Sequence, residues 1–103
     1  MPTKSHRNDL LKRLASPRYS AKYLKAALDD GDTEGFLLAL RNVIEASRNV
    51  SSVARKSRIS RQHIHRLVAG KGNPTLNTLK SVLQSVGLDI NFEPERPEGK
   101  KAA

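Results

Sequence analysis

The 103-residue sequence contains no cysteine and no tryptophan, and its only aromatic residues are two Phe and two Tyr. Without cysteine the chain can form neither disulfides nor thiolate metal sites. Because only 37% of the residues are apolar, the core must be small and aliphatic, which suits a single helical domain. No apolar run reaches the roughly 18 residues that a membrane-spanning helix needs, so we expect a cytoplasmic protein.

Acidic residues are missing from a long stretch in the second half of the chain. The formal net charge is +9, and no Asp or Glu stands between Glu45 and Asp89. The acidic residues gather instead at 29–34 and after residue 88. One half of the molecule is therefore suited to meet an anion, and we expect a nucleic-acid backbone. The acid-free stretch carries eight basic residues: Arg48, Arg55, Lys56, Arg58, Arg61, Arg66, Lys71 and Lys80.

The spacing of apolar residues predicts five helices, at about 20–28, 32–47, 49–56, 60–69 and 75–86. Asp32 or Thr33 is suited to cap the second helix, Ser60 and Thr75 to cap the last two, and Gly87 to end the fifth. We divide the chain into a flexible basic arm (1–18), a DNA-binding domain (19–93) and a disordered tail (94–103).

Apolar and polar residues alternate after Gly87, with Leu88, Ile90 and Phe92 on one side. This two-residue period predicts a strand. A lone strand has unpaired edges, so the pattern predicts that Leu88, Ile90 and Phe92 form a dimer contact with a second subunit. The expected fold is all-α, with five helices and a short C-terminal β-strand that pairs across a homodimer.

Residues 49–86 have the pattern of a helix-turn-helix unit, in which a second short helix enters the major groove of DNA. Ala54 is small enough for the two helices to cross closely, and Ile59 is suited to fill the turn. The second helix has one apolar side, and the expected contributors to it are Ile64, Leu67 and Val68.

The polar side of that second helix is the expected reading surface. Arg61 lies at its N-terminal end, and Gln62 and Arg66 lie opposite the apolar side. Arginine can bond to guanine through two hydrogen bonds, and glutamine to adenine. The alternative is that these residues only form a solvated helix face and that Ser60 is only a cap.

Enzymatic and metal-binding functions are not expected. His63 and His65 are two positions apart on a helix and diverge, and no carboxylate lies nearby in sequence. No nucleophile motif accompanies them. We therefore expect no catalytic residue, no metal and no cofactor.

The run Ser-Val-Ala-x4-Ile-Ser-Arg-x2-Ile-x2-Leu-x2-Gly-x2-Asn-Pro-Thr-x3-Leu at 52–79 resembles the lambda-repressor-like helix-turn-helix superfamily. The preceding segment, Tyr-Leu-x2-Ala-Leu-Asp-Asp-Gly-Asp at 23–32, is similar to the addiction-module antidote family of HigA-like antitoxins. The resemblance covers about 19–92. It implies a DNA-binding repressor that regulates its own operon, together with a small partner toxin of the RelE/ParE kind.

The resemblance also implies site residues. Base contacts fall on Arg61, Gln62 and His65. The superfamily's phosphate sites fall around Ser60, Asn73 and Thr75. Independently of the resemblance, we also expect phosphate contacts at Ser51, Arg58, Arg66 and Lys71.

One position departs from the superfamily pattern, because Arg58 stands where the turn usually has glycine. A positive φ is uncommon for any other residue. Either the turn is altered, or Arg58 accepts the strain and adds a phosphate contact. There are two alternatives to the interpretation as a repressor and antitoxin. One is a stand-alone phage or mobile-element regulator, and the other is a protein whose main task is to mask a toxin.

Overall fold

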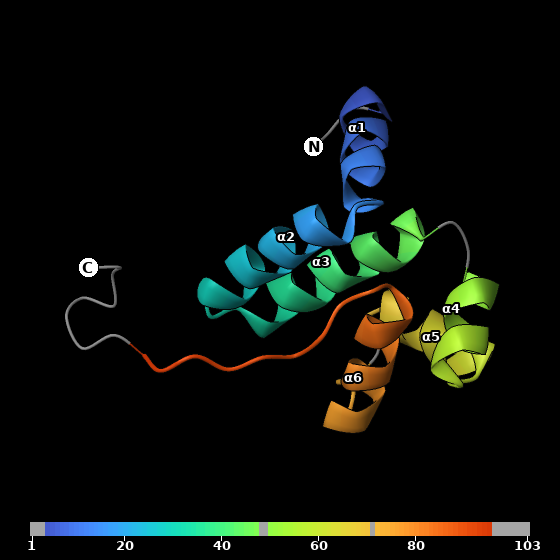
Figure 1. Cartoon of the computed structure of the whole chain (residues 1–103). Coiled ribbons are helices and arrows are strands. Elements are labelled where there is room, and N and C mark those ends of the chain that lie inside the picture. The colour runs from blue at the N-terminus through green and yellow to red at the C-terminus, as the bar shows by residue number, and fades with distance from the viewer. Residues whose placement is uncertain (1–3, 48–49, 71, 96–103) are drawn as a thin grey trace.

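A computed structural model describes residues 4–47, 50–70 and 72–95, and over these ranges the chain forms six helices (Figure 1). None of these helices is long and apolar enough to cross a membrane. The helices are α1 (Lys4–Leu14), α2 (Pro17–Asp29), α3 (Thr33–Ala46), α4 (Val50–Ser57), α5 (Arg61–Val68) and α6 (Leu76–Ser85).

The five helices that the sequence predicts correspond to α2–α6, and the expected caps are present. The side chains of Asp32, Ser60 and Thr75 each accept a backbone N–H in the first turn of α3, α5 and α6. Gly87 follows α6 with a φ of 86°, a conformation that glycine adopts without a steric penalty. The all-α class is therefore confirmed.

The prediction of five helices is wrong, because α1 forms a sixth within the segment expected to be a flexible arm. An isolated helix of this length is marginal in water. Here Leu14 is buried, Leu10 packs against the core, and α1 lies on both α2 and α3. Tertiary packing thus stabilises a helix that local sequence alone does not.

The predicted C-terminal strand is also wrong, since the described part of the chain contains no strand. The alternation after Gly87 is nevertheless real: Leu88 and Ile90 are half-buried against the core, whereas Asp89 and Asn91 are exposed. The two-residue period therefore marks an extended segment that packs on the domain's own helices. Because this segment is not a strand, the predicted strand pairing across a homodimer is also wrong.

Helix α3 is the centre of the fold, because α1, α2, α4 and α5 all pack on it (Figure 1). Its inner side is mainly apolar, with Leu40 and Ile44 inaccessible to solvent. Val53 of α4, Ile64 of α5 and Val82 of α6 complete the core. A single aliphatic core thus fixes the orientation of α5 relative to the rest of the molecule.

One buried polar residue connects the first three helices. The Asn42 amide of α3 donates from Nδ2 to the Tyr23 hydroxyl of α2 at 2.9 Å. Its Oδ1 accepts from Nη1 of Arg7 in α1 at 3.3 Å. Arg7 also forms an ion pair with Glu45 of α3. These contacts set how α1 lies on α3, which hydrophobic packing alone leaves loosely defined.

Asn42→Ala is expected to lower the free energy of unfolding by about 1–3 kcal/mol, because the Tyr23 hydroxyl and the Arg7 guanidinium each lose a partner. Urea denaturation followed by circular dichroism measures the change. Arg41→Ala is the matched control: Arg41 is exposed and 3.8 Å from Glu45, so we expect a change of at most about 0.5 kcal/mol. Equal effects of the two substitutions would show that the buried amide does not stabilise α1.

Candidate nucleic-acid interface

Helices α4 and α5 are joined by the short turn at 58–60, and the residues expected to pack this pair do so. Val53 and Ala54 of α4 are buried, and so are Ile64 and Leu67 of α5. Ile59 is half-buried and lies against the core. Helix α5 is consequently held on its inner side only, and its outer side remains in solvent.

The turn between α4 and α5 contains the only described non-glycine residue with a positive φ, which is Arg58 at 64°. Its N–H donates to the carbonyl of Ala54 at 2.9 Å and so closes the last turn of α4. The Ser57 hydroxyl then accepts from the N–H of Ile59 at 3.2 Å. The turn is therefore hydrogen-bonded around Arg58, and Arg58 accepts the left-handed conformation. The sequence places Ser57 in this turn but assigns its side chain no role, since a buried serine in a turn has no distinct pattern.

Arg58→Gly is expected to raise the free energy of unfolding by about 1 kcal/mol, because glycine adopts a left-handed conformation without the Cβ–carbonyl clash. Thermal and urea denaturation measure the gain. The matched control is Arg55→Gly, at an exposed helical position of α4, where glycine should cost about 1 kcal/mol. Destabilisation by both substitutions would mean that the Arg58 side chain stabilises the turn by more than the strain costs.

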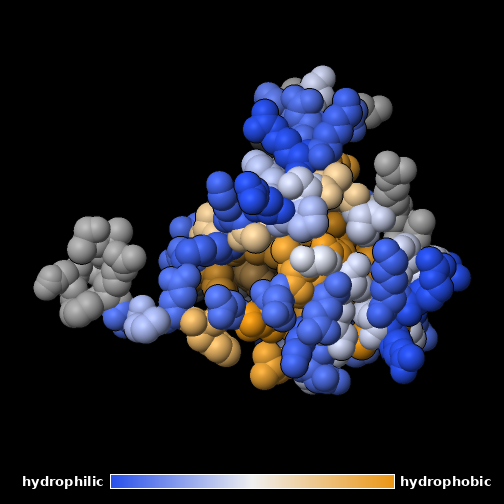
Figure 2. Space-filling model, in the orientation of Figure 1, coloured by the Kyte–Doolittle hydropathy of each residue, from blue (hydrophilic) through white to orange (hydrophobic). Residues whose placement is uncertain are grey.

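The outer side of α5 is polar and exposed. Arg61, Gln62, His65 and Arg66 are all exposed there, on the hydrophilic surface that Figure 2 shows over α4 and α5. The ion pairs between described side chains all lie on α1, α2 and α3. The positive charge of α5 is thus not compensated within the described part of the chain.

A small hollow of about 230 Å³ lies between α5 and the loop that follows it. Its lining brings together Arg66 of α5 and Asn73 of the loop, both expected to bind phosphate, and adds His63. Sequence reasoning considered His63 only as a metal ligand. The signal that it missed is the i, i+3 spacing of His63 and Arg66, which places both side chains on one side of the helix.

The expected hydroxyl contacts differ in what they can donate. Ser60 Oγ accepts from the His63 N–H at 3.0 Å, which leaves its own proton for a phosphate. Thr75 Oγ1 accepts from the Thr78 N–H and also donates to the Thr78 hydroxyl, both at 3.1 Å. At this site the first backbone N–H groups of α6 are therefore the better phosphate donors. Ser51 is exposed in the first turn of α4, and Lys71 lies outside the described residues.

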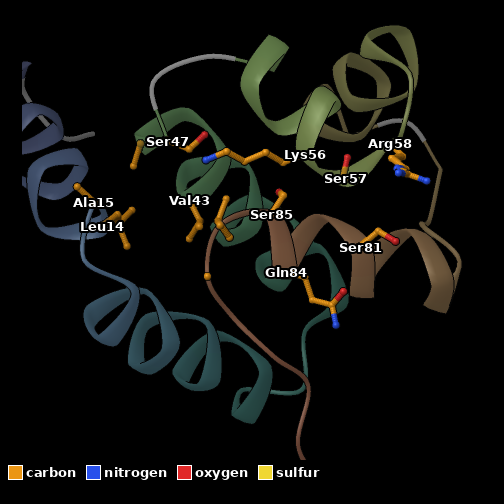
Figure 3. A pocket seen from close by; sticks show the side chains of 13 residues that line it. Leu14, Ala15, Val43, Ser47, Lys56, Ser57, Arg58, Ser81, Gln84 and Ser85 are labelled. Atoms are coloured by element: carbon orange, nitrogen blue, oxygen red, sulfur yellow. The ribbon is translucent and has the colours of Figure 1, made fainter.

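A larger cleft of about 790 Å³ lies between the end of α1 and helices α3, α4 and α6 (Figure 3). Lys56 and Arg58 are among the residues that line it, and Figure 3 shows Lys56 lying toward Ser47. Two of its serines do not favour an anion, however. Ser47 and Ser85 donate their protons to backbone carbonyls at 2.6 Å, so they present oxygen lone pairs to the cleft. These two hydroxyls are therefore not phosphate donors.

The fold and this surface define a small all-α protein whose basic helix face is directed to solvent. The chain belongs to the family of probable addiction module antidote proteins, whose family model matches residues 4–94. It is also similar to an uncharacterized protein of Haemophilus influenzae, with 32% identity over 88 residues that cover 85% of this chain and 90% of that protein. No solved structure shows significant similarity to the chain. Family membership indicates an antitoxin role in a toxin–antitoxin system, with a toxin as partner.

Proposed function

We propose that this antidote is a sequence-specific DNA-binding repressor of its own operon, and that α4 and α5 act as a helix-turn-helix unit of the lambda-repressor-like kind. The proposal rests on the contrast between the two sides of α5. Ile64 and Leu67 fix its inner side in the core, while Arg61, Gln62 and His65 are exposed on its outer side. No carboxylate occurs in the sequence from residue 46 to 88.

In this proposal α5 enters the major groove, whose width admits a helix. Arg61 is the first residue of α5 and reads guanine, Gln62 reads adenine, and His65 reads the base one turn further along. Phosphates on either side hold the helix in register. Their expected contacts are Ser51, Arg58, Ser60, Lys71, the Arg66–Asn73 hollow and the first N–H groups of α6, next to Thr75.

A single helix reads only a few base pairs, so we propose that two copies act as a homodimer on a pseudo-palindromic operator. The half-sites would then be separated by about 34 Å, one helical turn of DNA, or by a multiple of it. Leu88 and Ile90 pack on their own domain, so they are poorly placed to contact a second copy.

We further propose that the partner toxin is a small protein of the RelE/ParE kind, as for HigA-like antitoxins. Family membership supports a toxin partner over a stand-alone regulator. The test is co-expression with the reading frame adjacent to the gene. That frame should arrest growth when expressed alone, and this chain should restore growth.

The DNA-binding proposal is tested by fluorescence anisotropy with a duplex from the protein's own promoter and a scrambled duplex of equal composition. We expect tighter binding to the promoter duplex, and an affinity that falls steeply as salt rises. If Arg58 contacts a phosphate, Arg58→Gly should reduce the salt slope by about one. Arg18→Ala, an exposed cation on α2, is the control and should leave the slope unchanged. Equal affinity for both duplexes would contradict sequence-specific binding.

A further inference from the structure

The extended segment after α6 brings an apolar side chain to the end of α2. A Cβ atom on Gly87 would lie 3.3 Å from Cγ of Pro17, so the segment starts beside the first residue of α2. From there both run toward the turn between α2 and α3 (Figure 1). Five extended residues span about 17 Å and eleven helical residues about 16 Å. The far end of the segment, which carries Phe92, and the end of α2, which carries Leu28, therefore lie at the same end of the molecule (Figure 1).

Leu28 and Phe92 are unusually exposed for large apolar side chains. Leu28 is 61% exposed and Phe92 87%, and Figure 2 shows apolar surface between the extended segment and the helices. Neither residue is needed to complete the core, since Leu24 of α2 and Ile90 of the segment already pack there. Large apolar side chains that stay uncovered at one end of a small protein make that end a candidate surface for a partner.

The charge around this pair is opposite to that of the rest of the molecule. Asp30 and Asp32 lie in the turn after α2, and Glu93 follows Phe92 directly; all three are exposed. Asp29 is paired with Lys25 at 3.2 Å. In a chain of net charge +9, this end is therefore locally acidic. It fits a basic partner with apolar contact residues.

A second copy of the chain fits this surface less well. A two-fold symmetric contact places the same patch on both sides of the interface. The acidic patch with Asp30 and Glu93 would then face the same acidic patch of the other copy, which is unfavourable when desolvated.

We propose that this acidic end, formed by Leu28, Phe92, Asp30, Asp32 and Glu93, is where the antidote binds its toxin, through a basic surface of the toxin. This inference rests on the antitoxin role and reassigns Phe92 from the dimer contact expected from sequence. The acidic end and helices α4 and α5 lie on opposite sides of the molecule (Figure 1). Toxin and DNA therefore occupy separate surfaces, and one antidote binds both at once.

The test uses the full chain and the purified product of the adjacent reading frame as probe, with affinity measured by calorimetry. Leu28→Gln with Phe92→Gln is expected to weaken binding at least about tenfold, as for central interface residues. Asp30→Lys with Glu93→Lys is expected to weaken it similarly at low salt and less at high salt. Leu76→Gln is the matched control: Leu76 is 70% exposed at the start of α6, and its substitution should leave the affinity unchanged. Thermal denaturation confirms that each variant is folded.

Each other outcome overturns the inference in a recognisable way. Unchanged affinity in both double variants would place the toxin elsewhere while leaving the antitoxin role intact. A probe that does not bind the unmodified chain would refute the toxin pairing itself, together with the inference. If sedimentation shows that Leu28→Gln with Phe92→Gln converts a dimer to a monomer, the surface belongs to a second copy. Loss of promoter binding on addition of the probe would contradict separate surfaces.

Discussion

Ile64→Ala is expected to lower the free energy of unfolding by about 2–5 kcal/mol, the range for truncating a fully buried isoleucine. Ile64 is inaccessible to solvent and belongs to the cluster that also holds Leu40, Ile44 and Val53. Helix α5 has eight residues and packs on α3 and α4. It is too short to be stable alone. A cavity at Ile64 therefore removes much of what holds the exposed face of α5 in place.

Urea denaturation of the variant, followed by circular dichroism, measures this loss. Ile64→Val removes one methylene and is the control, with an expected cost of about 0.5–1.5 kcal/mol. Below its unfolding midpoint, Ile64→Ala should still bind promoter DNA, because the exposed side chains are unchanged. A loss of less than about 1 kcal/mol, well under the range for buried isoleucines, would show that α5 is held mainly by other contacts.

The five helices α2–α6 could be predicted from the sequence because their signals are local. Apolar residues recur at helical spacing, and Asp32, Ser60 and Thr75 are the cap residues that the structure uses. The helix α1 could not be predicted in this way. Its stability depends on the burial of Leu14 and on the contacts of Arg7 with Asn42 and Glu45, which lie 35 and 38 positions away in the chain.

The error at 88–92 has a related cause. Period-two alternation reports that one side of an extended chain is buried, but it does not report what covers that side. Leu88 and Ile90 pack on the domain's own core, so the extended segment needs no second strand to bury them. Its position beside α2 depends on the contact of Gly87 with Pro17, a pair 70 positions apart.

The candidate interface was predictable in its residue types and less so in its detailed geometry. Exposure of Arg61, Gln62 and His65 follows from the helical period around Ile64. The hollow that joins Arg66 to Asn73 depends on the path of the loop at 72–74, which no periodicity describes. At Arg58 the turn requires a positive φ, whereas arginine prefers a negative one. Such conflicts between residue type and backbone conformation are commonest at functional sites.

Arg61→Ala is expected to cost about 1–3 kcal/mol of promoter affinity, concentrated at one base pair, if its guanidinium bonds to a guanine edge. Arg61 is the first residue of α5, exposed, and shows no ion pair within the described chain. Anisotropy with the promoter duplex and with single-base variants of it measures the effect.

The loss of affinity should be absent on a duplex in which the contacted guanine is replaced. On that duplex neither the unmodified chain nor Arg61→Ala can form the arginine–guanine hydrogen bonds. Lys80→Ala, an exposed cation on α6, is the control and should not alter base preference. A uniform loss over all duplexes would instead place Arg61 on the phosphate backbone.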